Sequence, residues 1–328
     1  MKSSITNART VSIGGQRDYL TILDEAWQQH LAPRTKDAPT VISTFAGGGG
    51  SSLGYSMAGF RELLAVEWEQ NAVDTFRLNF PEVPVYHGDI AKLSVEEVFK
   101  LTGLKEGELD VFDGSPPCQG FSTAGKREMD DSRNMLFREY VRLLRGLKPK
   151  VFVMENVSGM VKGKMKLIFA EILRELKASG YKVSARLMNA MYFNVPQSRQ
   201  RMIFIGVRED LQAEPGHPTA KALPIPLRII APDAIGCKSQ QINSWIPASR
   251  PYCTIQKAGF LRETIRTAKG QREPTGQELR LFGSFPTQFQ FVGKFDQQWA
   301  RIGNSVPPLF MRAIAEHIRV EILNRMTV

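Results

Sequence analysis

The chain has 328 residues, of which 42% are hydrophobic and 23% charged, and its formal net charge is +10. This is the composition of an ordinary globular protein with room for one large α/β domain and a smaller lobe. No apolar run approaches the ~20 residues of a membrane span, and the first residues lack the apolar core of a signal peptide, so we expect a cytoplasmic protein. Three cysteines without a Cys-x-x-Cys pair, and four histidines without ligand spacing, argue against a metal site. The positive charge favours a polyanionic partner.

Residues 1–39 predict an N-terminal arm that ends in a helix and a linker. Apolar residues recur at helical spacing at Leu20, Leu23, Trp27 and Leu31. The pattern predicts an amphipathic helix packed on the main domain; a helix that binds a partner protein is the alternative.

A glycine-rich turn follows the first predicted strand, residues 40–45. Residues 46–52 read Ala-Gly-Gly-Gly-Gly-Ser-Ser, and glycines let the backbone turn sharply and approach a ligand closely. Ser51 or Ser52 is expected to cap a helix over residues 53–58, whose N-terminus favours polar or anionic groups. A turn without a binding role is the alternative for this loop taken alone.

Two further strand ends carry carboxylates. Residues 62–67 predict a strand ending at Glu67, about 20 residues past the glycines, where a carboxylate can bind a ribose hydroxyl pair. Trp68 can stack on an adenine, and a third strand ends near Asp89. Because no clear G-x-G-x-x-G turn is present, the sequence predicts a Rossmann-like site for an adenosine without a pyrophosphate.

A candidate nucleophile, Cys118, follows a predicted strand over residues 109–113. Two prolines precede Cys118 and stiffen its support. A buried, unreactive thiol is the alternative for this residue taken alone. The polar loop 119–134 is long enough to act as a lid, and a helix over residues 136–147 follows it.

Residues 151–154 predict a buried strand that ends in Glu155, where removal from water favours the protonated carboxyl. A carboxylate that caps the next turn is the alternative. After a helix over residues 164–178, Arg199 and Arg201 precede the strand 202–207 and, two residues apart, point to one face.

The character of the chain changes over residues 208–271, where prolines are frequent and apolar runs are short. Between Lys221 and Glu273 nine basic residues stand against three acidic ones, a difference of +6. A solvated face is the ordinary explanation, but this concentration suits phosphate contact. Residues 272–286 predict a helix, and another follows residues 303–306.

The ordered motifs resemble those of the C5-cytosine DNA methyltransferase family of bacterial and phage type. These are Phe-Ala-Gly-Gly-Gly-Gly at 45–50, Gly-Ser-Pro-Pro-Cys-Gln at 114–119, Glu-Asn-Val at 155–157, Gln-Ser-Arg-Gln-Arg at 197–201 and Gly-Asn-Ser-Val at 303–306. The resemblance implies an α/β, Rossmann-like, AdoMet-dependent methyltransferase with a mostly parallel sheet and a small irregular target-recognition lobe. The implied division is 1–39 for the arm, 40–207 for catalysis, 208–271 for the lobe and 272–328 for the return to the catalytic domain.

The family's chemistry assigns roles to four residues. The Cys118 thiolate adds to C6 of a flipped-out cytosine and makes C5 nucleophilic, while Glu155 donates a proton to N3. By the resemblance Arg201 holds the cytosine O2, and Arg199 or Arg201 is expected to favour the thiolate. S-adenosyl-L-methionine supplies the methyl group and leaves as S-adenosyl-L-homocysteine. The expected cofactor contacts are Phe45, Gly47, Gly49, Glu67, Trp68, Asp89, Ile90, Pro117, Leu136 and Asn304.

The implied partner is double-stranded DNA. We expect the chain to act as a monomer at the nucleoid, with a cognate restriction endonuclease as a functional partner. The expected DNA contacts are Gln119, Ser122, Arg133, Arg228, Lys238, Gln240, Gln241, Asn243, Arg250 and Lys257. Because only about 208–249 is left as variable sequence, rich in proline that favours loops, we expect a target of about two to four base pairs.

Ser43 and Thr44 stand where the family often has Asp-Leu, which alters the first motif slightly. An RNA cytosine methyltransferase is the nearest alternative, but the Cys-Phe-Thr element of the tRNA-acting branch is absent. A catalytically silent DNA-binding subunit is a second alternative, against which the intact Cys118 and Glu155 argue.

Overall fold

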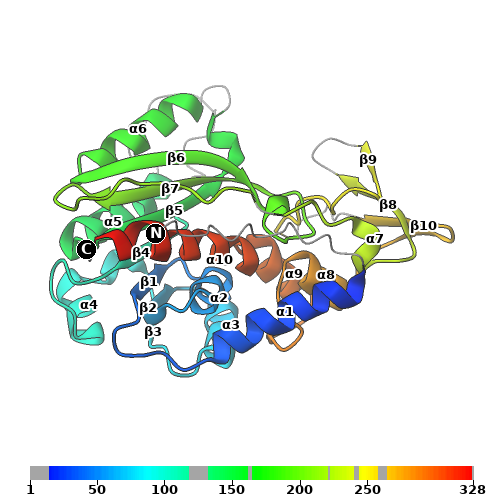
Figure 1. The fold of residues 1–328 in the computed structure, drawn as a ribbon, viewed down its shortest axis with the longest axis horizontal. Coiled ribbons are helices and arrows are strands. Elements are labelled where there is room, and N and C mark those ends of the chain that lie inside the picture. The colour runs from blue at the N-terminus through cyan, green and yellow to red at the C-terminus, as the bar shows by residue number, and fades with distance from the viewer. Residues whose placement is uncertain are drawn as a thin grey trace, which may run out of the picture.

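The computed structural model describes residues 15–117, 132–161, 165–220, 222–239, 244–257 and 264–326. Within these residues the chain forms a seven-stranded sheet covered by helices and a separate four-stranded sheet (Figure 1).

The central sheet has the strand order β3-β2-β1-β4-β5-β7-β6. Its strands are β1 Thr40–Thr44, β2 Arg61–Glu67, β3 Val85–His87, β4 Val111–Gly114, β5 Val151–Val157, β6 Tyr181–Asn189 and β7 Gln200–Arg208. In the described part of the chain, only β7 runs against the others. The expected mostly parallel α/β sheet is confirmed, although β6 was not predicted from the sequence.

Helices cover both faces of this sheet. Val41 of β1 faces a core shared with α1 Gln16–Leu31 and α2 Gly50–Met57, whereas the next residue, Ile42, faces a core shared with α5 Ser132–Leu147 and α6 Met165–Lys177. Such alternation is expected where both faces of a strand are buried. Also described are α3 Gln70–Asn79 and α4 Val95–Thr102.

The N-terminal helix α1 packs on the main domain, as its apolar spacing predicted. Tyr19 and Leu23 are fully buried, and the Tyr19 hydroxyl donates to the carbonyl oxygen of Leu281 at 3.1 Å. Helix α2 begins earlier than expected, because Gly49 is its N-cap with φ of +97°. Ser51 and Ser52 therefore lie inside the helix, and the expectation that one of them caps it is wrong.

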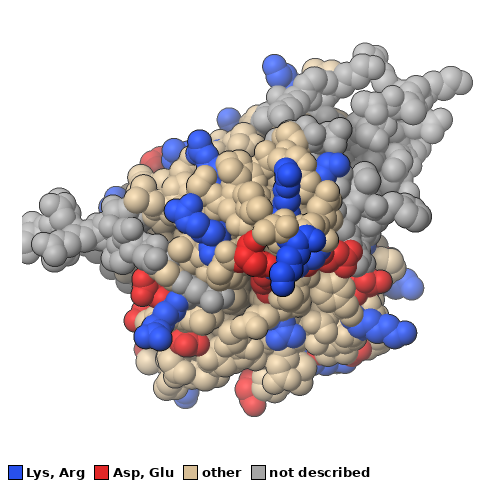
Figure 2. Space-filling model, turned by 90° about the vertical axis from the view of Figure 1, so that its right-hand side faces the viewer, with Lys and Arg blue, Asp and Glu red and all other residues tan. Residues whose placement is uncertain are grey.

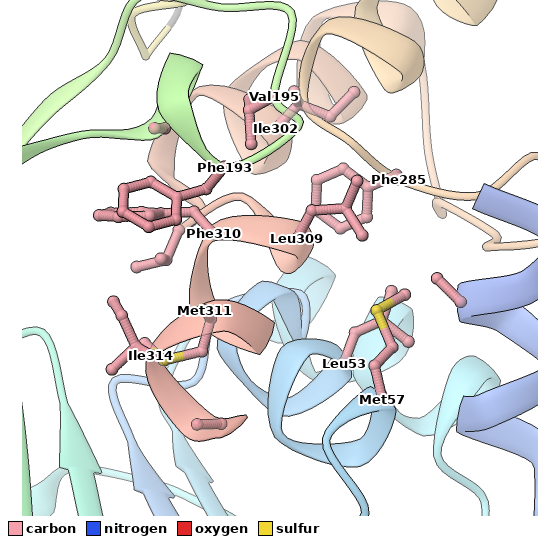
Figure 3. Packing of buried hydrophobic residues seen from close by; sticks show 14 of the residues in the cluster. Leu53, Met57, Phe193, Val195, Phe285, Ile302, Leu309, Phe310, Met311 and Ile314 are labelled. Carbon is pink, nitrogen blue, oxygen red and sulfur yellow. The ribbon is translucent and has the colours of Figure 1, made fainter. Parts of the chain in front are cut away.

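The C-terminal helices α8 Gly276–Phe282, α9 Phe295–Asn304 and α10 Pro308–His317 return to the main domain. Helix α10 packs against α2 so closely that a Cβ on Gly54 would lie 2.6 Å from the Cβ of Met311. Figure 3 shows the apolar side chains of this region, with Leu53 on α2 and Ile314 on α10. The last helix therefore supports the helix that follows the glycine turn.

The lobe is more regular than the sequence indicated. It contains α7 Leu227–Ile230 and the strands β8 Ala234–Ser239, β9 Ser244–Pro247, β10 Thr264–Thr267 and β11 Gly270–Arg272, in the antiparallel order β11-β10-β8-β9. The expectation of loops alone is wrong: Cys237 of β8 and Ile265 of β10 are fully buried, and β9 and β11 pair with these two central strands at the sheet edges. The helix expected from residue 272 begins at Gly276, after a capping box of Thr275 and Glu278.

Candidate active site

The carboxyl ends of β1, β2, β4 and β5 meet at one edge of the central sheet, where open α/β sheets bind ligands. Phe45 follows β1, Glu67 ends β2, Pro117 follows β4 and Glu155 lies near the end of β5. Cys118 is the residue after Pro117 and lies outside the described residues, as do Gln119 and Ser122.

Glu67 organises the glycine turn. Its carboxylate is buried and accepts hydrogen bonds from the backbone N–H groups of Gly47 at 2.8 Å, Trp68 at 2.8 Å and Glu69 at 2.9 Å. Two carboxylate oxygens accept about four hydrogen bonds in all, so room remains for about one further donor. Glu67 can therefore accept one ribose hydroxyl while it holds the turn in shape.

The turn itself requires glycine. Gly47 and Gly49 have φ of +56° and +97°, values that side chains disfavour, and a Cβ on Gly49 would lie 2.6 Å from the ring of Phe80. Phe45 also has a positive φ, of 54°, and is half-buried. An added Cβ on Gly47 would meet no atom within 4 Å, so the turn is open at this residue.

The other expected cofactor residues line the neighbouring strand ends. Trp68 is 75% exposed, and its carbonyl oxygen lies 3.2 Å from His87 Nε2 at the end of β3. Two residues after His87, Asp89 caps a short 3-10 turn through the N–H of Ala91, and Ile90 is buried beside it. The strand order β3-β2-β1 therefore brings this part of the predicted set together.

Asn304 and Leu136 reach the same region from later elements. Asn304 is exposed at the end of α9, and Arg301 of that helix binds Glu69, which follows Trp68. Leu136 of α5 is half-buried and packs against the core that also contacts Phe45. A flat exposed indole, a buried carboxylate and an open glycine turn fit an adenosine moiety.

The carboxyl group of Glu155 forms an ion pair with Arg201. Arg201 Nε lies 2.6 Å from Glu155 Oε1, and the side chains are only 14% and 11% exposed. The pair forms because β5 and β7 are antiparallel, with Val157 opposite Arg201, so the start of β7 meets the end of β5. Both groups therefore lie at the same edge of the sheet as the end of β4, from which the chain continues to Cys118.

Asn156 links that edge to the two prolines. Its Nδ2 donates to the carbonyl oxygen of Pro116 at 3.0 Å, and its Oδ1 accepts from the N–H of Val157 at 2.8 Å. Asn156 was predicted only as part of a motif, although a polar amide at the end of a buried apolar strand is a signal in the sequence. The contact fixes the backbone that leads to Cys118 relative to Glu155.

Arg199 has different partners from Arg201. It is 2% exposed, and it donates through Nη1 to the carbonyl oxygen of Ile255 at 2.9 Å and through Nη2 to that of Gly303 at 2.7 Å. Arg199 therefore joins three segments: the start of β7, the stretch between β9 and β10 that contains Ile255, and the end of α9 next to Asn304. In the structure Arg199 is thus a backbone clamp, and its catalytic role stays a prediction.

A buried acidic cluster lies beneath the glycine turn and was missed from the sequence. Asp113 of β4 pairs in register with Ser43 of β1, and its carboxylate accepts from the hydroxyl of Tyr55 at 3.2 Å. Burial, and then the nearby Glu62, raise the pKa of Asp113 well above its usual range. Burial also raises the pKa of Glu62 to about 7, although Ser52 donates to it at 2.9 Å.

The expected DNA contacts are only partly described. Arg228, Arg250 and Lys257 are exposed on the lobe and Lys238 is half-buried, while Gln240, Gln241 and Asn243 lie outside the described residues. Arg133 belongs to α5, and its side chain is likewise outside the description. Figure 2 shows Lys and Arg side chains spread over the lobe end, with few Asp or Glu side chains in its upper half.

Two negative findings hold for the described ranges. None of their helices combines the length and apolar character needed to cross a membrane. They also contain no cluster of three or more His, Cys, Asp or Glu side chains arranged to hold a metal ion.

Comparison with known proteins shows the family. The family of C-5 cytosine-specific DNA methylases matches residues 39–240 and 237–320 of the chain. The type II methyltransferase M1.HphI of Haemophilus parahaemolyticus is 35% identical over 324 residues, which cover 85% of this chain and 86% of that protein. The type II methyltransferase M.NgoPII of Neisseria gonorrhoeae is 35% identical over 342 residues, covering 89% and 98%.

The fold is shared with solved structures. A putative DNA modification methyltransferase encoded within an E. coli prophage aligns with a TM-score of 0.72 at 23% identity, covering 87% of this chain and 99% of that one. The matched residues include the glycine turn, the strand end that carries Glu155 and the helix that ends at Asn304. The chain therefore belongs to the C-5 cytosine-specific DNA methylase family.

Proposed function

We propose that the chain transfers a methyl group from S-adenosyl-L-methionine to C5 of cytosine in double-stranded DNA. The observation that carries this proposal is the Glu155–Arg201 ion pair, held by Asn156 beside the Pro-Pro segment before Cys118. N3 and O2 of cytosine are neighbouring atoms. A carboxyl and a guanidinium 2.6 Å apart can bind both at once, with protonated Glu155 donating to N3 and Arg201 donating to O2.

The proposed reaction balances without an external oxidant or reductant. The thiolate of Cys118 adds to C6 while N3 gains a proton from Glu155, which makes C5 nucleophilic. S-adenosyl-L-methionine supplies the methyl group that bonds to C5. A water molecule then takes the C5 proton, Cys118 leaves C6 as the thiolate so that the aromatic ring is restored, and N3 returns its proton to Glu155. Because these atoms are hidden in a stacked duplex, the cytosine must first leave the helix.

The cofactor fits the residues described at the sheet edge. Glu67 has room for one ribose hydroxyl, exposed Trp68 offers a stacking face, and the turn at Gly47 lies open. The lid 119–134 and the lobe are proposed to hold the DNA, and we keep the expectation of a short target.

Bisulfite sequencing of plasmid DNA from a host that expresses the chain tests the proposal. We expect methylated cytosines within one short sequence, and none with Cys118→Ser, because a hydroxyl is a far weaker nucleophile than a thiolate. In parallel, tritiated methyl transfer to DNA and to RNA separates the alternatives. Label in RNA alone would show an RNA methyltransferase, and label in neither, with intact DNA binding, would show a silent subunit.

A further inference from the structure

The lobe sheet has one buried and one outward face. Cys237 of β8 and Ile265 of β10 are opposite each other, fully buried, and part of the main hydrophobic core. Because side chains alternate along a strand, the neighbouring positions Gly236 and Lys238 of β8 and Arg266 of β10 lie on the other face. Arg266 is exposed and Lys238 is half-buried there.

An arginine is stacked on a tryptophan across this outward face. The guanidinium carbon of Arg266 lies 5.6 Å from the ring centroid of Trp245, which belongs to β9 and is opposite Lys238. Strand β8 lies between β10 and β9, and its residue opposite Arg266 is Gly236. Because glycine has no side chain, the long Arg266 side chain can cross the central strand; a Cβ on Gly236 would also meet the carbonyl oxygen of Ile246 at 2.5 Å.

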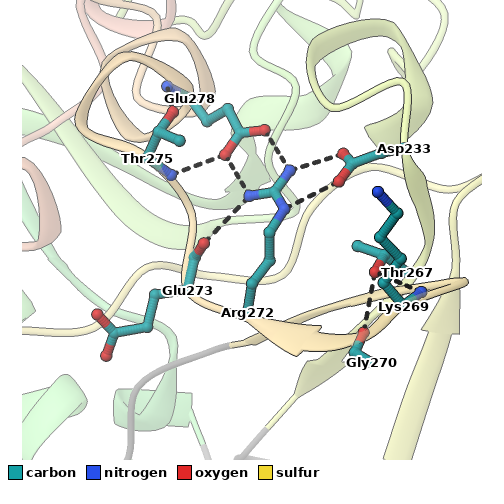
Figure 4. Close-up of polar contacts among 8 residues, drawn as sticks. All are labelled: Asp233, Thr267, Lys269, Gly270, Arg272, Glu273, Thr275 and Glu278. Atoms are coloured by element: carbon teal, nitrogen blue, oxygen red, sulfur yellow. Dashed lines mark hydrogen bonds and ion pairs between the residues drawn. The ribbon is translucent and has the colours of Figure 1, made fainter.

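The cations of this face have no counter-charge on the sheet. None of the four strands contains Asp or Glu. Arg272 of β11 is already occupied, since it binds Asp233 and Glu278 (Figure 4). Within the described residues, by contrast, no carboxylate forms an ion pair with Lys238 or Arg266.

We propose that this face, formed by Lys238, Trp245 and Arg266 and called here the Arg–Trp face, binds the phosphate backbone of duplex DNA. A guanidinium stacked on an aromatic ring keeps its N–H edge free, and its planar fork matches phosphate oxygens. Stacking also restricts the arginine before DNA arrives, which lowers the entropy lost on binding. The inference rests on the proposed function for the identity of the nucleic acid, and it adds Trp245 and Arg266 to the expected contacts.

The test is equilibrium binding of the full chain to two unmethylated duplexes over a range of salt concentrations. One duplex contains the target sequence found by bisulfite sequencing, and the other lacks it. Arg266→Ala should weaken binding to both duplexes by the same factor and reduce the slope of log K against log salt by about 0.9, the value for one phosphate. Lys100→Ala, which removes one exposed charge from α4, is the matched control and should leave the slope unchanged. The inference would be overturned if Arg266→Ala left the salt slope unchanged, or if it weakened binding only to the duplex that contains the target sequence.

A double-mutant cycle tests the role of Trp245. If the indole acts by orienting the guanidinium, Trp245→Ala should weaken binding, and Trp245→Ala with Arg266→Ala should bind no worse than Arg266→Ala alone. Fully additive effects would contradict the stacked arrangement. Arg266→Lys, which keeps the charge and conserves the sheet surface, should retain the slope with lower affinity, and it covers the case in which the alanine variant fails to fold.

The inference and the proposed function fail separately. Methyl transfer to DNA by the natural chain, with binding unaffected by Arg266→Ala, would refute the Arg–Trp face alone. Binding through that face without methyl transfer would refute the proposed activity alone.

Discussion

Arg301 of α9 donates through Nη2 to both carboxylate oxygens of Glu69, each at 2.5 Å. Arg301 is 5% exposed and Glu69 is 40% exposed, so the pair is partly buried. Glu69 follows Trp68, whereas Arg301 precedes Asn304 on its helix. The ion pair therefore sets the spacing between two expected walls of the cofactor site, one from the start and one from the end of the chain.

Glu69→Gln should weaken cofactor binding and leave DNA binding unchanged, because it breaks the ion pair that joins the segment of Trp68 to the helix of Asn304. We expect KM for S-adenosyl-L-methionine to rise roughly tenfold, which corresponds to about 1.4 kcal/mol, with KM for DNA unaltered. Glu316→Gln breaks a comparable but exposed pair with Arg312 on α10 and serves as the control. Equal cofactor affinity in Glu69→Gln and the natural chain, measured by calorimetry, would contradict the role of the pair.

Glu155→Gln should lower kcat by about 10² to 10⁴, the contribution of a well-placed general acid. The amide is isosteric and keeps an acceptor for Arg201, so the sheet edge should stay folded and cofactor binding should change little. Single-turnover rates at saturating cofactor and DNA measure the effect. Near-normal turnover in this variant would show that N3 is protonated by another group.

Glu62→Gln should stabilise the protein in a way that depends on pH. The pKa of Glu62 is about 7 in the fold, above the ordinary value of 4.5, so between these values the folded state keeps a proton that the unfolded state loses. Stability from this group is full below about pH 4.5 and falls as pH rises to about 7. The variant should therefore gain on the order of 1–3 kcal/mol over the natural chain above pH 7 and little at pH 4.5.

Thermal melts of both proteins at several pH values measure this gain. Glu316→Gln, which replaces a carboxylate on the surface, should show no such trend. A constant difference in Tm between Glu62→Gln and the natural chain across pH would mean that burial does not hold the Glu62 proton.

Arg272→Met should loosen the lobe. Arg272 donates to Asp233, which precedes β8, and to Glu278 in the first turn of α8, at 2.6 to 3.0 Å (Figure 4). These groups are partly exposed, so we expect a loss of about 1–2 kcal/mol in unfolding free energy, measured by urea denaturation. Arg272→Lys keeps the charge but lacks the forked guanidinium, so its unfolding free energy should lie between those of the natural chain and Arg272→Met. An equal loss in both variants would show that the charge alone contributes nothing.

The sequence predicted the binding edge of the central sheet because strands such as β2 and β5 are largely apolar and lead into a carboxylate, whereas the mixed residues of β6 gave no such signal. Glu67 and Glu155 were found in this way. The lobe strands were not predicted, because four-residue segments such as Thr264–Thr267 bury only one side chain. One buried residue does not make a detectable alternation of apolar and polar positions.

Contacts between distant segments could not be read from local patterns. Arg199 was chosen by resemblance, but its bonds to Ile255 and Gly303 depend on how the chain returns after the lobe. The pairing of Ser43 with Asp113 likewise follows from strand order rather than from either segment. Cys118 and the loop after it lie outside the described residues, so their roles stay predictions.

The packing of α10 on α2 has a consequence for how the protein is made. The ribosome releases α2 early and α10 late, yet Gly54 and Met311 are in direct contact in the finished fold. Until α10 emerges, the side of α2 that packs on α10 is exposed, and exposed apolar surface favours aggregation of the nascent chain. The glycine turn gains this support only at the end of translation, so a polypeptide that stopped short of α10 would carry every strand of the central sheet but lack the helix that packs on α2.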